Sequence, residues 1–166
     1  GFGLAASSLV GQHLGEGDEE TAEIYGHEVV VLAVATYAVS AAIVALFARP
    51  IVSLFGTEAA AIPIAVGLVY AGSVAIIPQG VNATIAGALD ATGDTNWPFI
   101  YRVIGMVGVS LPAAYLGATT PLGIVGLYIA FFGETLVPAI GNYHRFSTGR
   151  WKAISREYRP EASLDD

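Results

Sequence analysis

The stretch AAAIPIAVGLVYAGSVAIIPQGVNATIAGAL, residues 59–89, contains 31 residues and no charged side chain. As a straight helix it would be about 46 Å long, at about 1.5 Å per residue. The hydrocarbon core of a bilayer is only roughly 30 Å thick. The stretch therefore predicts a membrane-spanning helix that tilts, bends or projects beyond the core. Pro78 lies inside it and is the expected position of a bend.

Three further apolar segments are long enough to cross a bilayer, which takes about 20 helical residues. They are residues 23–48, 97–116 and 122–143. Residues 1–14 are apolar but too short, and we expect them to be the end of a helix that begins upstream. The sequence thus predicts an all-α, polytopic transmembrane helix bundle with about four full spans plus the end of a truncated one.

The composition agrees with a membrane protein. Of the 166 residues, 54% are hydrophobic and 13% are charged, with a net charge of −7. A soluble domain carries about 25% charged residues, and its helices keep a polar face, which residues 23–48 and 59–89 lack. Buried helices of a soluble protein are the less favoured alternative. The acidic charge argues against nucleic acid as a partner.

The residues that enzymes and metal sites use are sparse. The chain has no cysteine, which excludes disulfides, thiolate nucleophiles and cysteine-ligated metals. Its histidines at 13, 27 and 144 are too scattered to suggest a metal site, and no nucleophile lies at helical spacing from a base. We expect no enzymatic activity and no resident cofactor or metal.

The basic residues predict the orientation in the membrane. Five of the seven lie in or directly before the C-terminal tail, at positions 145, 150, 152, 156 and 159. Because basic loops stay inside, we expect a multi-pass protein of the cell membrane with a cytoplasmic C-terminus. Counting back along the spans, the polar turns at residues 15–20 and 90–96 fall on the same side.

Two regions follow from this pattern: a transmembrane bundle over residues 1–145 and a cytoplasmic basic, amphipathic tail over residues 146–166. Four large side chains recur in the tail at near-helical spacing: Phe146, Trp151, Ile154 and Tyr158. One interpretation is a short helix lying on the anionic inner leaflet. The other is a solvated, partly disordered tail, and the sequence does not choose between them.

The first polar turn has the residues that end one helix and begin the next. Gly15 and Gly17 can adopt positive φ and close the preceding helix. Asp18 can cap the following helix, where the acidic residues after it are also favourable.

The second polar turn repeats this arrangement. Gly93 is expected to end the helix over residues 59–89, and the residues Asp94 to Asn96 are expected to cap the next one. Pro98 then lies in the first turn of that helix, where proline is well tolerated.

Three motifs together resemble the multidrug and toxic compound extrusion (MATE) family: LVGQHLGEGD at residues 9–18, ALDATGDTNWP at 88–98 and RFSTGRW at 145–151. The resemblance covers nearly the whole chain and implies the last four helices of a twelve-helix transporter, plus the end of the eighth. It implies a secondary antiporter that exports cationic or amphipathic drugs in exchange for H⁺ or Na⁺. The implied partners are the lipid bilayer, the missing N-terminal lobe of the same transporter and a small cationic cargo.

The chain departs from this family at several positions. The family usually has a basic residue and a glycine at the positions of Asp90 and Ala91, and often an arginine at that of Asn96. Its sodium-coupled branch has an aspartate near the position of Gln79. The resemblance therefore supplies no carboxylate cation site in this lobe, and coupling would fall to acidic residues of the N-terminal lobe.

Ionisable side chains inside a bilayer cost about 2.5–3.5 kcal/mol on insertion scales and are functional candidates. Arg102 and Glu134 lie in the two segments flanking a turn centred near Thr119. Residue 102 should then be level with about residue 136, so we predict that the two side chains pair. The pair could serve helix packing alone, or gating and cargo contact.

Polar side chains after Pro78 are further candidates. Gln79 and Asn82 share one face of the predicted helix, and Thr84 follows. Transporters bind cargo where bent helices carry polar groups near mid-depth, but interhelical hydrogen bonds for packing would use the same residues. With Arg102 and Glu134, they form the set of cargo or cation pathway candidates.

Two alternatives to drug export remain open. One is a lipid-linked oligosaccharide flippase of the same superfamily, which should have a more basic cavity. The other is an inactive, truncated membrane protein.

Overall fold

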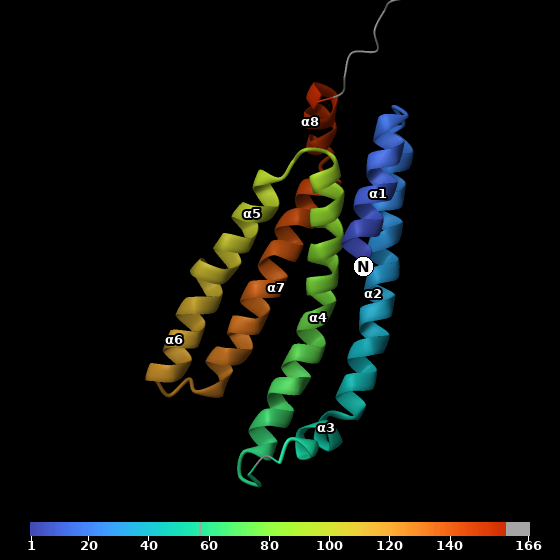
Figure 1. The fold of residues 1–166 in the computed structure, drawn as a ribbon. Helices are drawn as coiled ribbons and strands as arrows, with labels where there is room; N and C mark the ends of the chain where they lie inside the picture. Colours follow the sequence, from blue (N-terminus) through green and yellow to red (C-terminus); the bar gives the residue numbers. More distant parts are fainter. Residues whose placement is uncertain (57, 159–166) are drawn as a thin grey trace, which may run out of the picture.

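The structure is a computed structural model that describes residues 1–56 and 58–158, and every regular element within them is a helix (Figure 1). The elements are α1 (Phe2–Gly15), α2 (Glu19–Leu46), α3 (Ala48–Leu54), α4 (Ile62–Ala91), α5 (Asn96–Val103), the π-helical η1 (Ile104–Ser110), α6 (Leu111–Thr119), α7 (Ile124–Ser147) and α8 (Arg150–Tyr158).

Four helical stretches of the described chain are long and apolar enough to cross a membrane. They are Glu19–Leu46, Ile62–Ala91, Asn96–Thr119 and Ile124–Ser147. Each overlaps most of one of the four predicted segments, so the predicted all-α bundle with four spans is confirmed. Large apolar side chains remain exposed along these helices, with Val31 at 69% and Ile140 at 61% exposure. Lipid is the medium in which such surfaces are stable.

The helices form one bundle around α4. Helices α1 and α2 pack together on one side of α4, and α7 packs on another side. The continuous stretch of α5, η1 and α6 lies against α7 at the edge of the bundle (Figure 1). This stretch is the least covered span, with only 6% of its most apolar window buried.

Two prolines shape the long helices. Pro78 lies inside the continuous helix α4, and the axis of α4 changes direction near its middle (Figure 1). Pro112 lies at the start of α6, directly after the π-helical segment. A proline cannot donate to the carbonyl four residues back, and its ring crowds that carbonyl. The predicted segment 97–116 is therefore interrupted by wider π-helical turns.

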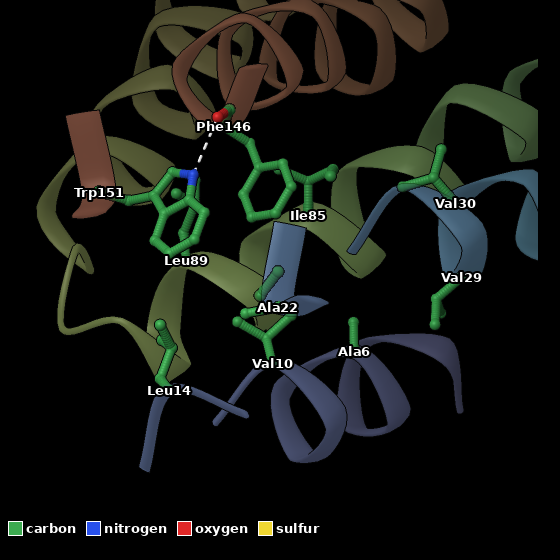
Figure 2. Close-up of a cluster of buried hydrophobic side chains, with 11 residues drawn as sticks. Ala6, Val10, Leu14, Ala22, Val29, Val30, Ile85, Leu89, Phe146 and Trp151 are labelled. Atoms are coloured by element: carbon green, nitrogen blue, oxygen red, sulfur yellow. Dashed lines mark hydrogen bonds between the residues drawn. The ribbon is translucent and has the colours of Figure 1, made fainter. Parts of the chain in front are cut away.

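The buried core gathers at one end of the bundle, which we call the polar end: the turn between α1 and α2, the turn between α4 and α5, and α8. Small and branched side chains of α1, α2 and α4 surround Phe146 of α7 and Trp151 of α8, both fully buried (Figure 2). The core thus joins the three motifs noted in the sequence.

Candidate functional site

The two polar turns have the same backbone geometry. Gly17 has φ +83° and Gly93 has φ +84°. In each turn, the aspartate that follows donates its backbone N–H to the carbonyl five residues back, His13 O at 2.9 Å and Leu89 O at 3.0 Å. This is the Schellman ending, in which only glycine takes the left-handed position without strain. Gly15 was also predicted to adopt positive φ, and this is wrong.

Gly15 is the last residue of α1 and keeps helical geometry. A single left-handed residue is enough to end the helix, and Gly17 supplies it.

The first turn continues into a capped helix. Asp18 accepts the backbone N–H of Thr21 at 3.0 Å and the Thr21 hydroxyl at 2.6 Å. These hydrogen bonds stabilise the carboxylate, so they lower the pKa of Asp18 below its ordinary value of 3.8.

The second turn uses its aspartate differently. Asp94 was predicted to cap the next helix, and this is wrong, because α5 begins after Thr95 with no side-chain cap. Asp94 is only 3% exposed, and its Oδ2 accepts Nε of Arg145 at 2.7 Å. The Arg145 guanidinium also lies 5.0 Å from the ring centre of Trp97. The carboxylate thus binds the Arg145 cation of α7, in a charge-assisted hydrogen bond, rather than a backbone N–H of α5. Pro98 lies in the first turn of α5.

The third motif folds back onto the bundle. Gly149, with φ +67°, ends the turn after α7. The indole of Trp151 donates its Nε1–H to the carbonyl of Phe146 at 2.9 Å, and the two rings stack at 5.2 Å (Figure 2). Neither predicted form of the tail fits residues 146–151, because Phe146 and Trp151 are buried in protein rather than in lipid or water.

Helix α8 also makes ionic contacts with α2. Lys152 pairs with Glu23. Arg156 donates two hydrogen bonds to Glu19, at 2.8 and 2.6 Å, which raise the pKa of the arginine. The Tyr158 side chain and residues 159–166 of the predicted tail lie outside the described part of the chain.

Asn82 binds the side-chain amide of Asn142, a residue that was not among the candidates predicted from the sequence. Asn142 of α7 donates its Nδ2 to Asn82 Oδ1 at 2.8 Å. Asn142 is fully buried, and its Oδ1 has no hydrogen-bond partner. An amide in the apolar stretch of residues 122–143 was the available signal, because such groups need partners across helices.

The other two candidates after Pro78 lie apart from this pair. Thr84 is buried but donates its hydroxyl to the carbonyl of Gly80 in its own helix, at 2.8 Å. Gln79 is exposed on the surface of α4.

The predicted ion pair between Arg102 and Glu134 is not formed. Both side chains are exposed, and neither has an ionic partner in the described residues. Tyr101 packs against Gly141, so Arg102 is level with about residue 140 of α7. It is therefore roughly 9 Å further along α7 than Glu134 at about 1.5 Å per residue. The prediction failed because it placed the centre of the hairpin too early in the chain.

An apolar groove of about 690 Å³ runs between α2, α4 and α7. It is lined by Val30, Ile77, Pro78, Val81, Leu136, Ala139, Ile140, Tyr143, His144 and Ser147. Glu134 lines a smaller pocket of about 230 Å³ on the other side of α7, with Leu68 and Ser110. The described residues contain no cluster of potential metal ligands.

Comparison with known proteins identifies the family of the chain. Residues 1–116 match the sequence profile of the MatE family. The chain belongs to the MatE family. In the structure of this MatE chain, the three motifs noted in the sequence meet at the polar end, where Asp94 of the second motif pairs with Arg145 of the third.

Curated relatives of this MatE chain include named transporters. It is 28% identical over 156 residues to the uncharacterized transporter YisQ of Bacillus subtilis, covering 90% of this chain and 34% of the relative. It is 31% identical over 144 residues to the probable multidrug resistance protein NorM of Bradyrhizobium diazoefficiens, covering 84% and 31%. It is 28% identical over 134 residues to the multidrug resistance protein MdtK of Pectobacterium atrosepticum, covering 78% and 29%.

The chain thus spans about a third of the length of these relatives. No solved structure matches it significantly.

Proposed function

We propose that this MatE chain acts within a secondary active antiporter that exports cationic or amphipathic drugs in exchange for H⁺ or Na⁺. The observation that carries the proposal is the family match over residues 1–116. It is supported by relatives whose names describe multidrug resistance. Because the chain covers about a third of their length, the activity is proposed for the full product of the gene.

The physical basis of export is the ion gradient. One elementary charge moving inward is worth about 2.3 kcal/mol per 100 mV. In transporters built from repeated halves, such energy drives rocking of one half against the other around a central site. This bundle would contribute to one half.

We further propose that the polar end faces the cytoplasm. It gathers the basic side chains of Arg145, Lys152 and Arg156 with both glycine-aspartate turns. Basic residues next to membrane spans favour the cytoplasmic side. Labelling of a cysteine introduced at the exposed Ala153 of α8 tests this: an impermeant maleimide should react in inverted vesicles and not in intact cells.

The proposed cargo or cation pathway includes Gln79, Asn82, Thr84, Arg102 and Glu134. The strongest support lies at Asn82, because its partner Asn142 has a fully buried oxygen without a hydrogen bond. Such a group is costly in an apolar interior and suits a position that binds a polar group for part of a transport cycle. Glu134 supports the pathway as an exposed carboxylate in a pocket beside α4.

The test is an efflux assay on the complete open reading frame that encodes these residues. In a host lacking its own drug pumps, the protein should lower the accumulation of ethidium, a lipophilic cation. A protonophore or the removal of Na⁺ should abolish the effect and identify the coupling ion. Normal membrane expression with unchanged ethidium accumulation, across a panel of cationic dyes, would reject drug export.

Point variants test the pathway separately. Gln79→Ala and Asn82→Ala should lower ethidium efflux at equal expression. Thr36→Ala is the matched control, because Thr36 is an exposed polar residue of α2 whose hydroxyl bonds only within its own helix. Efflux that stays at the wild-type rate in both variants would show that these side chains are not part of the pathway.

A further inference from the structure

The apolar groove lies between α2 and α7 and reaches the last residue of α7, Ser147, at the polar end. Helices α2 and α7 flank it and both pack on α4, while they have little contact with each other. Near the polar end, Phe146 of α7 crosses to α2. Its ring lies directly on Gly26, where any Cβ atom would collide with it. The ring of His27 meets Phe146 edge to face, with 5.4 Å between the ring centres.

Helix α8 holds Phe146 in this position. The Trp151 ring stacks on the Phe146 ring at an interplanar angle of 9°, and its Nε1–H binds the Phe146 carbonyl (Figure 2). Both side chains are fully buried against Val10, Ile85 and other members of the core cluster. The position of Phe146 against α2 thus depends on where α8 lies.

Ion pairs attach α8 to the first turns of α2. Lys152 and Arg156 lie one helical turn apart and bind Glu23 and Glu19, which have the same spacing on α2. These pairs are partly exposed, with Arg156 at 65% and Lys152 at 27% exposure. Exposed ion pairs are weak and screened by salt, so this attachment can be adjusted without unfolding the core.

We propose that α8 is a clasp that fastens α7 to α2 at the polar end, beside the groove. The ion pairs position α8, Trp151 of α8 supports Phe146, and Phe146 bridges the two helices at Gly26. Movement of α2 away from α7 at this end requires the clasp to shift. The clasp is a feature of the bundle itself and does not depend on which cargo the transporter carries.

Distances between spin labels test the clasp in the complete membrane protein. The chain has no native cysteine, so labels at Val31→Cys and Ile140→Cys report on α2 and α7 once any cysteines elsewhere in the reading frame are replaced by serine. Both positions are exposed. The parent protein should show one narrow distance distribution. Arg156→Glu, which brings a carboxylate to Glu19, should add a second population at distances longer than that of the parent protein.

Two controls separate the clasp from a general loss of structure. Arg150→Glu reverses a charge on the same helix, at an exposed arginine without an ionic partner in the described residues, and should leave the distribution unchanged. The swap Glu19→Arg with Arg156→Glu restores an attractive pair and should restore the short distance.

Trp151→Ala should lengthen the distance even with both ion pairs intact, because Phe146 loses its support. A distribution that Arg156→Glu and Trp151→Ala leave unchanged, or that the charge swap does not restore, would overturn the clasp. Since the readout is a distance, a protein that exports no dye still tests it.

Discussion

Arg145 and Asp94 are 51 residues apart in the sequence, yet Nε of the arginine donates to Oδ2 of the aspartate over 2.7 Å. Their side chains are only 12% and 3% exposed. The pair joins the end of α7 to the turn between α4 and α5, and Trp97 covers the guanidinium. In the sequence, the turn between α4 and α5 is typical of a local helix end. In the structure, its aspartate also makes a tertiary contact between two motifs.

Breaking this pair should destabilise the bundle strongly. Asp94→Ala leaves the largely buried Arg145 charge without its partner, which costs about 3 kcal/mol in comparable sites. The double variant Asp94→Ala with Arg145→Ala should lose less than the sum of the single losses, because no lone charge remains. Reversible unfolding in detergent measures this coupling. Asp90→Ala, at an exposed carboxylate, is the control; additive losses at 94 and 145 would contradict the prediction.

The two glycines of the first turn should respond differently to alanine. Gly17→Ala forces an L-residue into the left-handed region and should cost about 1–2 kcal/mol. Gly15→Ala should be neutral or slightly stabilising, since this residue is helical and has open space around it. Thermal unfolding of both variants provides the comparison, and equal losses would show that both positions need glycine.

The close approach of α1 to α4 should depend on Gly87. A Cβ atom there would collide with the backbone carbonyl of Gly3, which cannot rotate away. Gly87→Ala should therefore cost about 1–3 kcal/mol, as in other overpacked sites. Gly72→Ala is the matched control in the same helix, with nothing within 4 Å of its Cβ position. It should stabilise α4 by about 0.5–1 kcal/mol. A neutral Gly87→Ala would mean that the two helices can separate freely.

The cap of α2 should weaken only in acid. The pKa of Asp18 is lowered in the folded state by the hydrogen bonds from Thr21. A lowered folded pKa means that the stabilisation is complete above the ordinary value of 3.8 and is lost as the pH falls through the lower folded value.

Amide exchange at Thr21, corrected for its intrinsic rate, measures the cap. Protection should be constant from neutral pH down to about the ordinary carboxyl pKa and then fall. In Asp18→Asn, whose amide caps without a charge, it should not change with pH. A decline in the parent protein that begins near neutral pH would contradict the assigned group.

The spans could be predicted from the sequence because each is a local property. Residues 59–89 lack any charge, and a bilayer accepts such a stretch only as a helix with its backbone hydrogen bonds satisfied internally. The glycines at 17 and 93 were equally readable, since a helix ending with a left-handed residue favours glycine.

Partners across the bundle could not be read in the same way. The register of two helices shifts with the length of the turn between them. The expected register of the hairpin was wrong by a few residues, so Arg102 and Glu134 do not lie at the same level. Asn142 binds Asn82, and Arg145 binds Asp94, because the helices pack together in a way that no local sequence pattern encodes.

The sequence alone determined that this chain lies in lipid, where it crosses and how its polar turns are built, because hydrophobic length and glycine geometry act over a few residues. Only the tertiary structure decided that the three motifs meet, and that the basic C-terminal helix binds the acidic start of α2. Ion pairs and ring stacking need atoms within a few ångströms of one another, and that proximity arises only when the whole bundle packs.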